Sequence, residues 1–191
     1  MDSNSRIYVA GRDTLVGRAL LKRLATRGFT RVVHDAEPDL SDRREVSAFF
    51  ERVRPEFVFL TAGKVSGIAG NQQWPADLMI DNLRAASTVV PAAWESQVRK
   101  LLYLGSSCVY PKAAPQPFNV SSLGSGPMEA TSQAYAVAKL AGMKCARRIG
   151  ASTMPRSSRR SQATRTVPAM ISASRIPTLR QACCGGFTRP V

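Results

Sequence analysis

The sequence has very little histidine, few cysteines and no long apolar run. His34 is the only histidine and the four cysteines show no CxxC spacing, so a zinc site lacks suitably spaced ligands. No run of about 18 apolar residues is present, as a membrane-spanning helix requires. The first six residues also lack the apolar core of a signal peptide. We therefore expect a cytoplasmic protein without a metal site or a disulfide framework.

Acidic residues are absent from the last quarter of the chain. Residues 146–191 contain nine arginines and no lysine, aspartate or glutamate, so they carry most of the net charge of +14. They are rich in Ser, Arg, Pro and Thr and show no strand or helix periodicity. This composition predicts an irregular or disordered basic tail over residues 149–191. A basic tail can bind nucleic acid, so a non-enzymatic nucleic-acid-binding protein is one alternative for the function.

Residues 1–148 alternate between short apolar runs and amphipathic segments. The patterns predict strands at 6–10, 31–34, 57–61 and 100–105, and helices at 16–24, 43–54, 76–98 and 132–148. Continuous apolar strands that alternate with helices indicate a parallel sheet covered on both faces. We therefore predict an α/β fold, a doubly wound parallel Rossmann sheet, with residues 1–148 as a dinucleotide-binding domain.

A glycine-rich turn separates the first predicted strand from the first predicted helix. It begins at Gly11, which permits a tight turn, and ends at Gly17, where helix and strand must approach closely. The spacing predicts a pyrophosphate site on the free N–H groups of Thr14, Leu15 and Val16. Thr14 stands where the fingerprint has its middle glycine and narrows the approach, although its hydroxyl can donate to a phosphate. An ordinary strand-to-helix turn is the alternative.

An acid at the end of the second strand is the usual partner of the adenosine ribose. Asp35 lies 24 residues beyond Gly11 and is expected to accept a hydrogen bond from the ribose 2′-hydroxyl of NAD, whereas an arginine there would favour NADP. An ordinary loop acid is the alternative for Asp35. Leu40 and Ala62 follow in the segments expected to line the adenosine site.

Tyr135 and Lys139 form a Y-x-x-x-K motif on the last predicted helix. A spacing of four places both side chains on one helix face, and Lys139 can also reach the nicotinamide ribose of the cofactor. An ammonium group beside a phenol stabilises the phenolate and lowers its pKa from about 10, which suits Tyr135 to proton transfer at neutral pH. The motif is common by chance, but here it follows a strand that ends in the run Gly-Ser-Ser-Cys-Val-Tyr-Pro, residues 105–111. This combination is specific.

Ser106 and Cys108 are the other candidate catalytic residues. We expect the strand to continue as an extended segment, which would place Ser106 and Cys108 on one face and Ser107 on the other. Ser106 can then hydrogen-bond a substrate carbonyl beside Tyr135, and Cys108 can transfer protons, a step that a simple reductase does not need. A buried small apolar residue is the alternative for Cys108, and Cys145 is expected in the core.

These motifs resemble the GDP-L-fucose synthase family, the GDP-4-keto-6-deoxymannose epimerase/reductases, from residue 6 to about 145. The stretches that carry the resemblance are 64–68, 74–77, 104–112, 135–144 and Asn82. The resemblance implies that Cys108 and a partner histidine epimerise C3 and C5 of a GDP-4-keto-6-deoxy-hexose, and that Tyr135 protonates the C4 oxygen while NADPH delivers hydride. It also implies that Ser106 polarises the carbonyl and Lys139 tunes Tyr135, and that intact members are homodimers.

Two departures bear on the cofactor. The family has a glycine at Thr14 and basic residues near Asp13 and Asp35 that hold the 2′-phosphate of NADP. The resemblance thus implies NADP, whereas both acids in this chain favour NAD. Another extended short-chain nucleotide-sugar epimerase or dehydratase is the second alternative for the function, and Cys108 disfavours it.

The tail lacks the segments that the resemblance implies after Lys139, including the partner histidine, because no histidine follows His34. We hypothesise that the family's next segment is translated there in a shifted reading frame. The shifted frame reads the third base of each codon together with the first two bases of the next. In that frame the pair Met170-Ile171 must encode Asp and the pair Cys183-Cys184 must encode Leu, as the family pattern requires. The chain would then lack the substrate domain and be poorly stable and inactive. Intact coding in the printed frame at the genomic locus would refute the shift.

Overall fold

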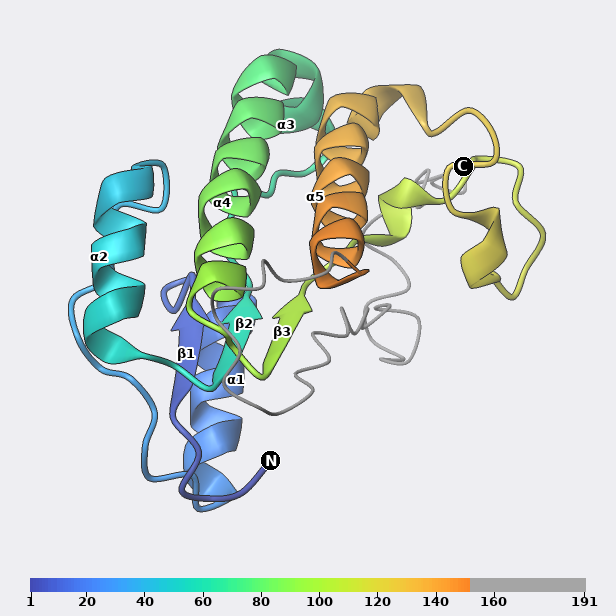
Figure 1. Ribbon diagram of the computed structural model, residues 1–191. Coiled ribbons are helices and arrows are strands. Elements are labelled where there is room, and N and C mark those ends of the chain that lie inside the picture. The colour runs from blue at the N-terminus through green and yellow to red at the C-terminus, as the bar shows by residue number, and fades with distance from the viewer. Residues whose placement is uncertain (152–191) are drawn as a thin grey trace, which may run out of the picture.

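Three parallel strands form the central sheet of this protein, whose computed structural model describes residues 1–151 (Figure 1). The strands are β1 Ile7–Ala10, β2 Phe57–Leu60 and β3 Lys100–Tyr103, in the order β1-β2-β3. In this register Ala10, Leu60 and Tyr103 lie side by side at the carboxyl edge. Three of the four predicted strands and the α/β, Rossmann-like fold class are therefore confirmed.

The predicted strand at residues 31–34 is wrong. The structure has one isolated parallel bridge there, between Ile7 and Val32. It is held by hydrogen bonds from the Ile7 N–H to the Arg31 carbonyl (3.0 Å) and from the Val33 N–H to the Ile7 carbonyl (2.8 Å). Val32 and Val33 are only half-buried, and His34 is exposed. Two apolar residues beside a single strand bury too little surface to extend the ladder.

All four predicted helices are confirmed, with ends that differ by a few residues. The helices are α1 Leu15–Thr26, α2 Arg43–Val53, α3 Ile68–Gln73, α4 Pro75–Glu95 and α5 Gln133–Ala151. The short helix α3 was not predicted, because six residues are too few to show a helical period. Three single turns of 3₁₀-helix lie between β3 and α5: η1 Ser107–Val109, η2 Val120–Ser122 and η3 Ala130–Ser132.

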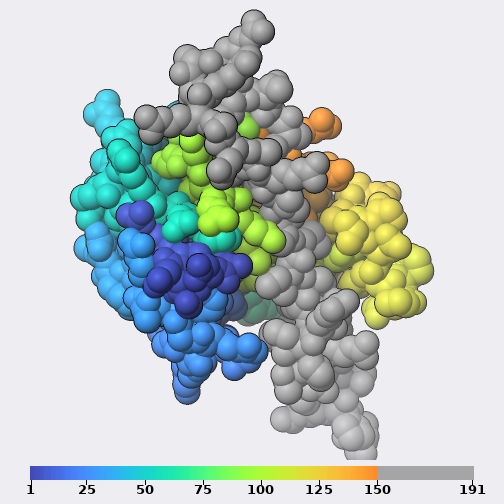
Figure 2. All heavy atoms as spheres, turned by 60° about the horizontal axis from the view of Figure 1, so that its bottom comes forward, coloured from blue at the N-terminus to red at the C-terminus, as the bar shows by residue number. Residues whose placement is uncertain are grey.

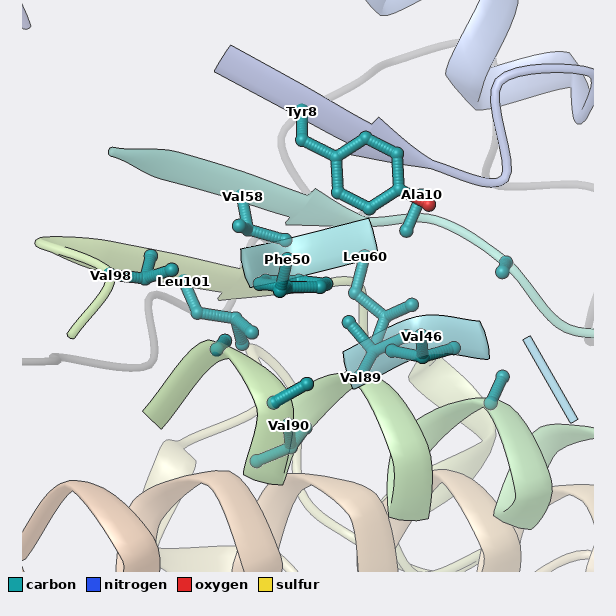
Figure 3. Close-up of a cluster of buried hydrophobic side chains, with 14 of the residues drawn as sticks. Tyr8, Ala10, Val46, Phe50, Val58, Leu60, Val89, Val90, Val98 and Leu101 are labelled. Carbon is teal, nitrogen blue, oxygen red and sulfur yellow. The ribbon is translucent and has the colours of Figure 1, made fainter. Parts of the chain in front are cut away.

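The helices cover the two faces of the sheet unequally. α1 packs on one face with Ile7 and Val9, while α2 and α4 pack on the other, and α5 runs beside α4 (Figure 1). Figure 3 shows Val58, Leu60 and Leu101 of the strands directed toward Val89 and Val90 of α4. The largest buried cluster of the described residues lies on this second face, as the 3.6-residue period of the helices requires.

The segment between β3 and α5 forms a separate lobe at the edge of the molecule. In Figure 2 its atoms, in yellow, gather on the side away from α2, in cyan. No helix within residues 1–151 is long and apolar enough to cross a membrane. Apart from residues 149–151, the last turn of α5, the predicted basic tail and the shifted frame lie outside the described residues.

Candidate active site

The glycine turn is built so tightly that side chains would not fit at its two ends. Gly11 has a φ of +88°, and a Cβ there would lie 2.5 Å from the Cα of Ala62. A Cβ on Gly17 would lie 2.2 Å from the carbonyl oxygen of Gly11. Both glycines thus keep β1, the loop after β2 and the start of α1 in contact. The cradle leaves backbone N–H groups at the start of α1 open to a ligand, which fits a dinucleotide pyrophosphate.

Thr14 is the N-cap of α1. Its Oγ1 accepts from the Gly17 N–H at 3.0 Å, and its hydroxyl donates to the Gly11 carbonyl at 2.8 Å. The hydroxyl is therefore used inside the turn, which it holds closed where the fingerprint has a glycine. The prediction of a free N–H group at Thr14 is wrong, because that N–H donates to the Gly11 carbonyl at 3.1 Å. Leu15 and Val16 are exposed just beyond Thr14, so the N–H groups left for a phosphate are those of these two residues.

Two acids follow the 31–33 segment, and the structure separates their surroundings. The carboxylate of Asp35 forms an ion pair with Arg52 of α2, at the exposed surface. The carboxylate of Glu37 accepts from the Gly11 N–H at 2.6 Å and from the Tyr8 hydroxyl at 3.1 Å. The role of Asp35 at the ribose stays a prediction. Sequence reasoning missed Glu37, although it lies 26 residues from Gly11, within the usual range for the ribose acid.

A small cavity of about 250 Å³ lies where the adenine was expected. Its walls are the loop 39–41, Ala62 and Gly63 after β2, and Asp81 and Arg84 of α4. Leu40 is anchored there by the Thr88 hydroxyl, which donates to its carbonyl at 2.6 Å. The fold thus brings together Leu40 and Ala62, two of the predicted cofactor residues, which are far apart in sequence.

Asn82 of α4 fixes the position of the loop that follows β2 through hydrogen bonds. Its Nδ2 donates to the carbonyls of Lys64 and Leu78, both at 2.8 Å, and Asp81 accepts from the Lys64 N–H at 2.7 Å. A Cβ on Gly63 would lie 2.1 Å from the Asn82 Oδ1. Asn82 and the 64–68 stretch, which both carry the family resemblance, therefore act as one structural unit beside the cofactor cavity.

Tyr135 and Lys139 share the inward face of α5, as their spacing predicted. Tyr135 is 8% exposed and Lys139 is 4% exposed. The Lys139 Nζ lies 5.8 Å from the ring centroid of Tyr135 and 5.2 Å from that of Tyr103. Burial lowers the pKa of Lys139 to about 8, against a smaller opposing effect of Asp81. The ammonium is thus held between two aromatic rings.

Tyr103, at the end of β3, is the residue of this cluster that sequence reasoning missed. Burial raises the pKa of its phenol above the ordinary value, and Tyr135 and Cys145 contribute. Its hydroxyl is buried with no hydrogen-bond partner among the described residues. A tyrosine at a strand end gives no sequence signal for this position, because only the packing of α5 over β3 creates it.

The prediction that the chain stays extended after β3 is wrong. Residues 107–109 form the turn η1, and Ser106 caps it, with its Oγ accepting from the Cys108 N–H at 3.3 Å. A serine with extended backbone is a good cap for such a turn, and fully buried Val109 anchors it. Ser106 and Cys108 are therefore not related by strand alternation, but η1 packs against α5. The turn brings both to the helix that carries Tyr135 and Lys139.

The two described cysteines differ in their surroundings, although both are free and half-buried. Cys108 lies in η1 beside α5, whereas Cys145 packs against the main core cluster, as expected. Burial raises the pKa of the Cys145 thiol. Among residues 1–151, no group of three or more His, Cys, Asp and Glu side chains is placed to hold a metal ion.

Comparisons with known proteins agree with this geometry. A family model described as "NAD dependent epimerase/dehydratase family" matches residues 7–157. The chain is 50% identical over 146 residues to "Probable GDP-L-fucose synthase 1" of Oryza sativa subsp. japonica, which covers 75% of this chain and 44% of that protein. It is 42% identical over 144 residues to GDP-L-fucose synthase of Escherichia coli strain K12, with 74% and 45% covered.

A solved structure gives the same result. The GDP-D-glycero-L-gluco-heptose synthase of Campylobacter jejuni, determined in the presence of NADPH, superposes with a TM-score of 0.75 at 30% identity. The match covers 90% of this chain and 47% of that one. The family resemblance found in the sequence is thereby confirmed. The chain spans less than half the length of the relatives that it matches.

Proposed function

The chain belongs to the NAD dependent epimerase/dehydratase family, and from this membership we propose that it carries the amino-terminal half of a nucleotide-sugar epimerase/reductase site. The substrate that we propose is GDP-4-keto-6-deoxymannose, with GDP-L-fucose as the product of the complete site. The observation that carries the proposal is the buried Lys139 beside the Tyr135 ring, on the helix that packs against the turn of Ser106 and Cys108. We also propose a cytoplasmic location.

The four catalytic residues have distinct roles in this proposal. The bound nicotinamide cofactor supplies hydride for C4 of the sugar. Tyr135 donates a proton to the C4 oxygen, and the ammonium of Lys139 stabilises the phenolate that remains. Ser106 polarises the C4 carbonyl by a hydrogen bond. Cys108 exchanges protons at C3 and C5, which the 4-keto group makes acidic.

The cofactor site is supported by the cradle of Gly11 and Gly17 and by the cavity beside Leu40 and Ala62. Membership of the family supports a nicotinamide dinucleotide. The resemblance favours NADP, whereas Asp13 inside the glycine turn and the acids that follow the 31–33 segment favour NAD. We propose that this choice is made by residues beside Gly11.

The 191-residue chain by itself is proposed to be inactive as a synthase. The resemblance requires a histidine as the second proton-transfer group, and none follows Lys139 in the sequence. Purified chain should therefore yield no GDP-L-fucose from GDP-4-keto-6-deoxymannose with NADH or NADPH. Product formation by the chain alone would refute this part of the proposal and leave the substrate assignment intact.

A chimera tests the roles of the residues. Residues 1–148 would be joined to the remaining carboxyl-terminal part of the Oryza relative and assayed for GDP-L-fucose formation. The chimera should be active, Tyr135→Phe and Lys139→Met should lower kcat by at least about 100-fold, and Cys108→Ser should block epimerisation. Cys145→Ser is the matched control and should change kcat little. Activity on other nucleotide-sugars alone would instead support a different epimerase or dehydratase of the family.

A further inference from the structure

Glu37 occupies the position beside the glycine turn that a ribose-binding acid would hold. The segment 31–33 runs parallel to β1, so the chain leaves it at the carboxyl edge of the sheet, next to Gly11. There the Glu37 Oε1 accepts from the Gly11 N–H at 2.6 Å. Ligands of open α/β sheets bind at this edge, and an acid after the second strand accepts from the ribose of NAD.

The Glu37 carboxylate is held in place from two sides. The hydroxyl of Tyr8, from the core side, donates to the same oxygen at 3.1 Å. Burial raises the pKa of Tyr8 well above its ordinary value, and the charge of Glu37 raises it further, so the phenol keeps the proton that it donates. Both hydrogen bonds use Oε1. Among the described residues nothing donates to Oε2, which can therefore accept from a ligand.

Two other charged groups at this edge, those of Asp35 and Arg12, have partners of their own. The carboxylate of Asp35 pairs with Arg52 on α2. The guanidinium of Arg12 donates to the carbonyls of His34, at 3.2 Å, and Asp35. Arg12 thus links the glycine turn to the segment that carries Glu37. Two of its guanidinium nitrogens are used in hydrogen bonds to backbone carbonyls. Glu37 is the acid whose carboxylate accepts from the Gly11 N–H.

We propose that Glu37, rather than Asp35, recognises the adenosine ribose, and that it makes this chain select NAD(H) over NADP(H). A carboxylate accepts a hydrogen bond from a free 2′-hydroxyl but repels a 2′-phosphate, whose charge at neutral pH is close to −2. The proposal rests on the proposed function, because it requires that the glycine turn binds a nicotinamide dinucleotide. It concerns specificity, and it runs against the NADP implied by the resemblance.

Binding to the full 191-residue chain tests the proposal without any catalytic assay. Titration calorimetry would compare NADH with NADPH, and 5′-AMP with adenosine 2′,5′-bisphosphate, which differ only in the 2′-phosphate. The wild-type chain should bind each ligand without the 2′-phosphate at least tenfold more tightly. Tighter binding of NADPH would overturn the role of Glu37 and leave the proposed function standing. Binding of neither dinucleotide would overturn both.

Two matched variants assign the effect to one acid. Glu37→Gln keeps the size and the acceptor oxygen for Gly11 but removes the charge, so the preference for NADH should fall at least tenfold. Asp35→Asn is the control and should leave the NADH/NADPH ratio within about twofold of wild type. Circular dichroism would confirm that both variants fold. A ratio that collapses in Asp35→Asn but not in Glu37→Gln would overturn the proposal.

Discussion

The two faces of the sheet are covered to different degrees, although they belong to the same three strands. On the face toward α4 and α5, here the α5 face, Leu60 and Leu101 are almost fully buried. On the face toward α1, here the α1 face, Phe57 and Phe59 are only half-buried, although Val9 beside them is buried. The alternation of side chains along a strand thus assigns each residue to one of the two sheet faces. How deeply the side chains of each face are buried depends on which helices lie over that face.

The same contrast separates the two halves of the candidate site. The cofactor turn lies at the start of α1, where glycine contacts and the Thr14 cap hold the backbone. The catalytic pair lies on the α5 face, where burial holds Lys139 between aromatic rings. One half is thus shaped by backbone geometry and the other by side-chain packing. Variants on each face should therefore respond differently.

The largest expected difference is between neighbouring residues of β2. Leu60→Ala on the α5 face should lower the free energy of unfolding by about 3 kcal/mol, since it leaves a cavity in a closed core. Phe59→Ala on the α1 face should cost about 1 to 2 kcal/mol, because the ring is already half in contact with water. Urea denaturation of the full chain measures both. Equal costs would show that the two faces are equally closed.

Lys139 should give a pH-dependent effect on the α5 face. Its pKa is lowered from 10.5 to about 8 in the folded protein, so below pH 8 the folded state bears the full cost of a buried ammonium. Between pH 8 and 10.5 the unfolded state binds more protons, and this cost fades as the pH rises. Lys139→Met should therefore be more stable than wild type below pH 8, by roughly 2 to 3 kcal/mol. Its advantage should shrink toward pH 10.5.

Thermal or urea unfolding across pH 7 to 10.5 measures this trend. Lys144→Met, at an exposed position of the same helix, is the control and should show no such trend. A difference between Lys139→Met and wild type that stays constant over the whole range would contradict the buried ammonium.

The cap of α1 should give a smaller effect on the α1 face. Thr14→Ala removes the acceptor for the Gly17 N–H and should lower the free energy of unfolding by about 1 kcal/mol. Thr26→Ala, at the other end of α1, loses only an exposed hydrogen bond to the Arg23 carbonyl and should cost less than about 0.5 kcal/mol. Urea midpoints compare them. An equal cost at both ends would argue against the cap as the support of the cofactor turn.

Effects of similar small size, but of opposite sign, are expected from two buried tyrosines of the α5 face. Tyr103→Phe removes a hydroxyl without a partner in the described part of the chain, and should raise the free energy of unfolding by up to about 1 kcal/mol. Tyr8→Phe removes a hydroxyl bonded to Glu37 and should lower it by about 1 kcal/mol. Thermal unfolding gives both signs. A loss of stability in Tyr103→Phe would mean that its hydroxyl is hydrogen-bonded.

Much of the fold follows from the amino-acid sequence, because the residues that the local patterns predict to be buried are buried in the structure. The apolar runs at β1, β2 and β3 were predicted within a residue or two. The strand predicted at 31–34 was wrong, since the same apolar pattern there makes a single bridge to β1 and its two valines stay half-buried. The turn η1 was also missed, because an apolar-flanked Ser-Ser-Cys-Val run is compatible with both a strand and a turn. The turn is held by the Ser106 cap and by backbone hydrogen bonds from Val109 to Ser106 and from Tyr110 to Ser107, which residue types alone do not reveal.

The sequence by itself determined the order of strands and helices, the glycine turn and the Y-x-x-x-K pair, since each depends on residues close together in the chain. Only the tertiary structure decided which acid meets Gly11 and which ring lies over Lys139. Glu37 and Tyr103 reach these places through contacts across 26 and 36 positions of the chain. Spacing along the chain says which residues can share a helix face or a turn. Which distant side chains meet is set by how the helices pack against the sheet.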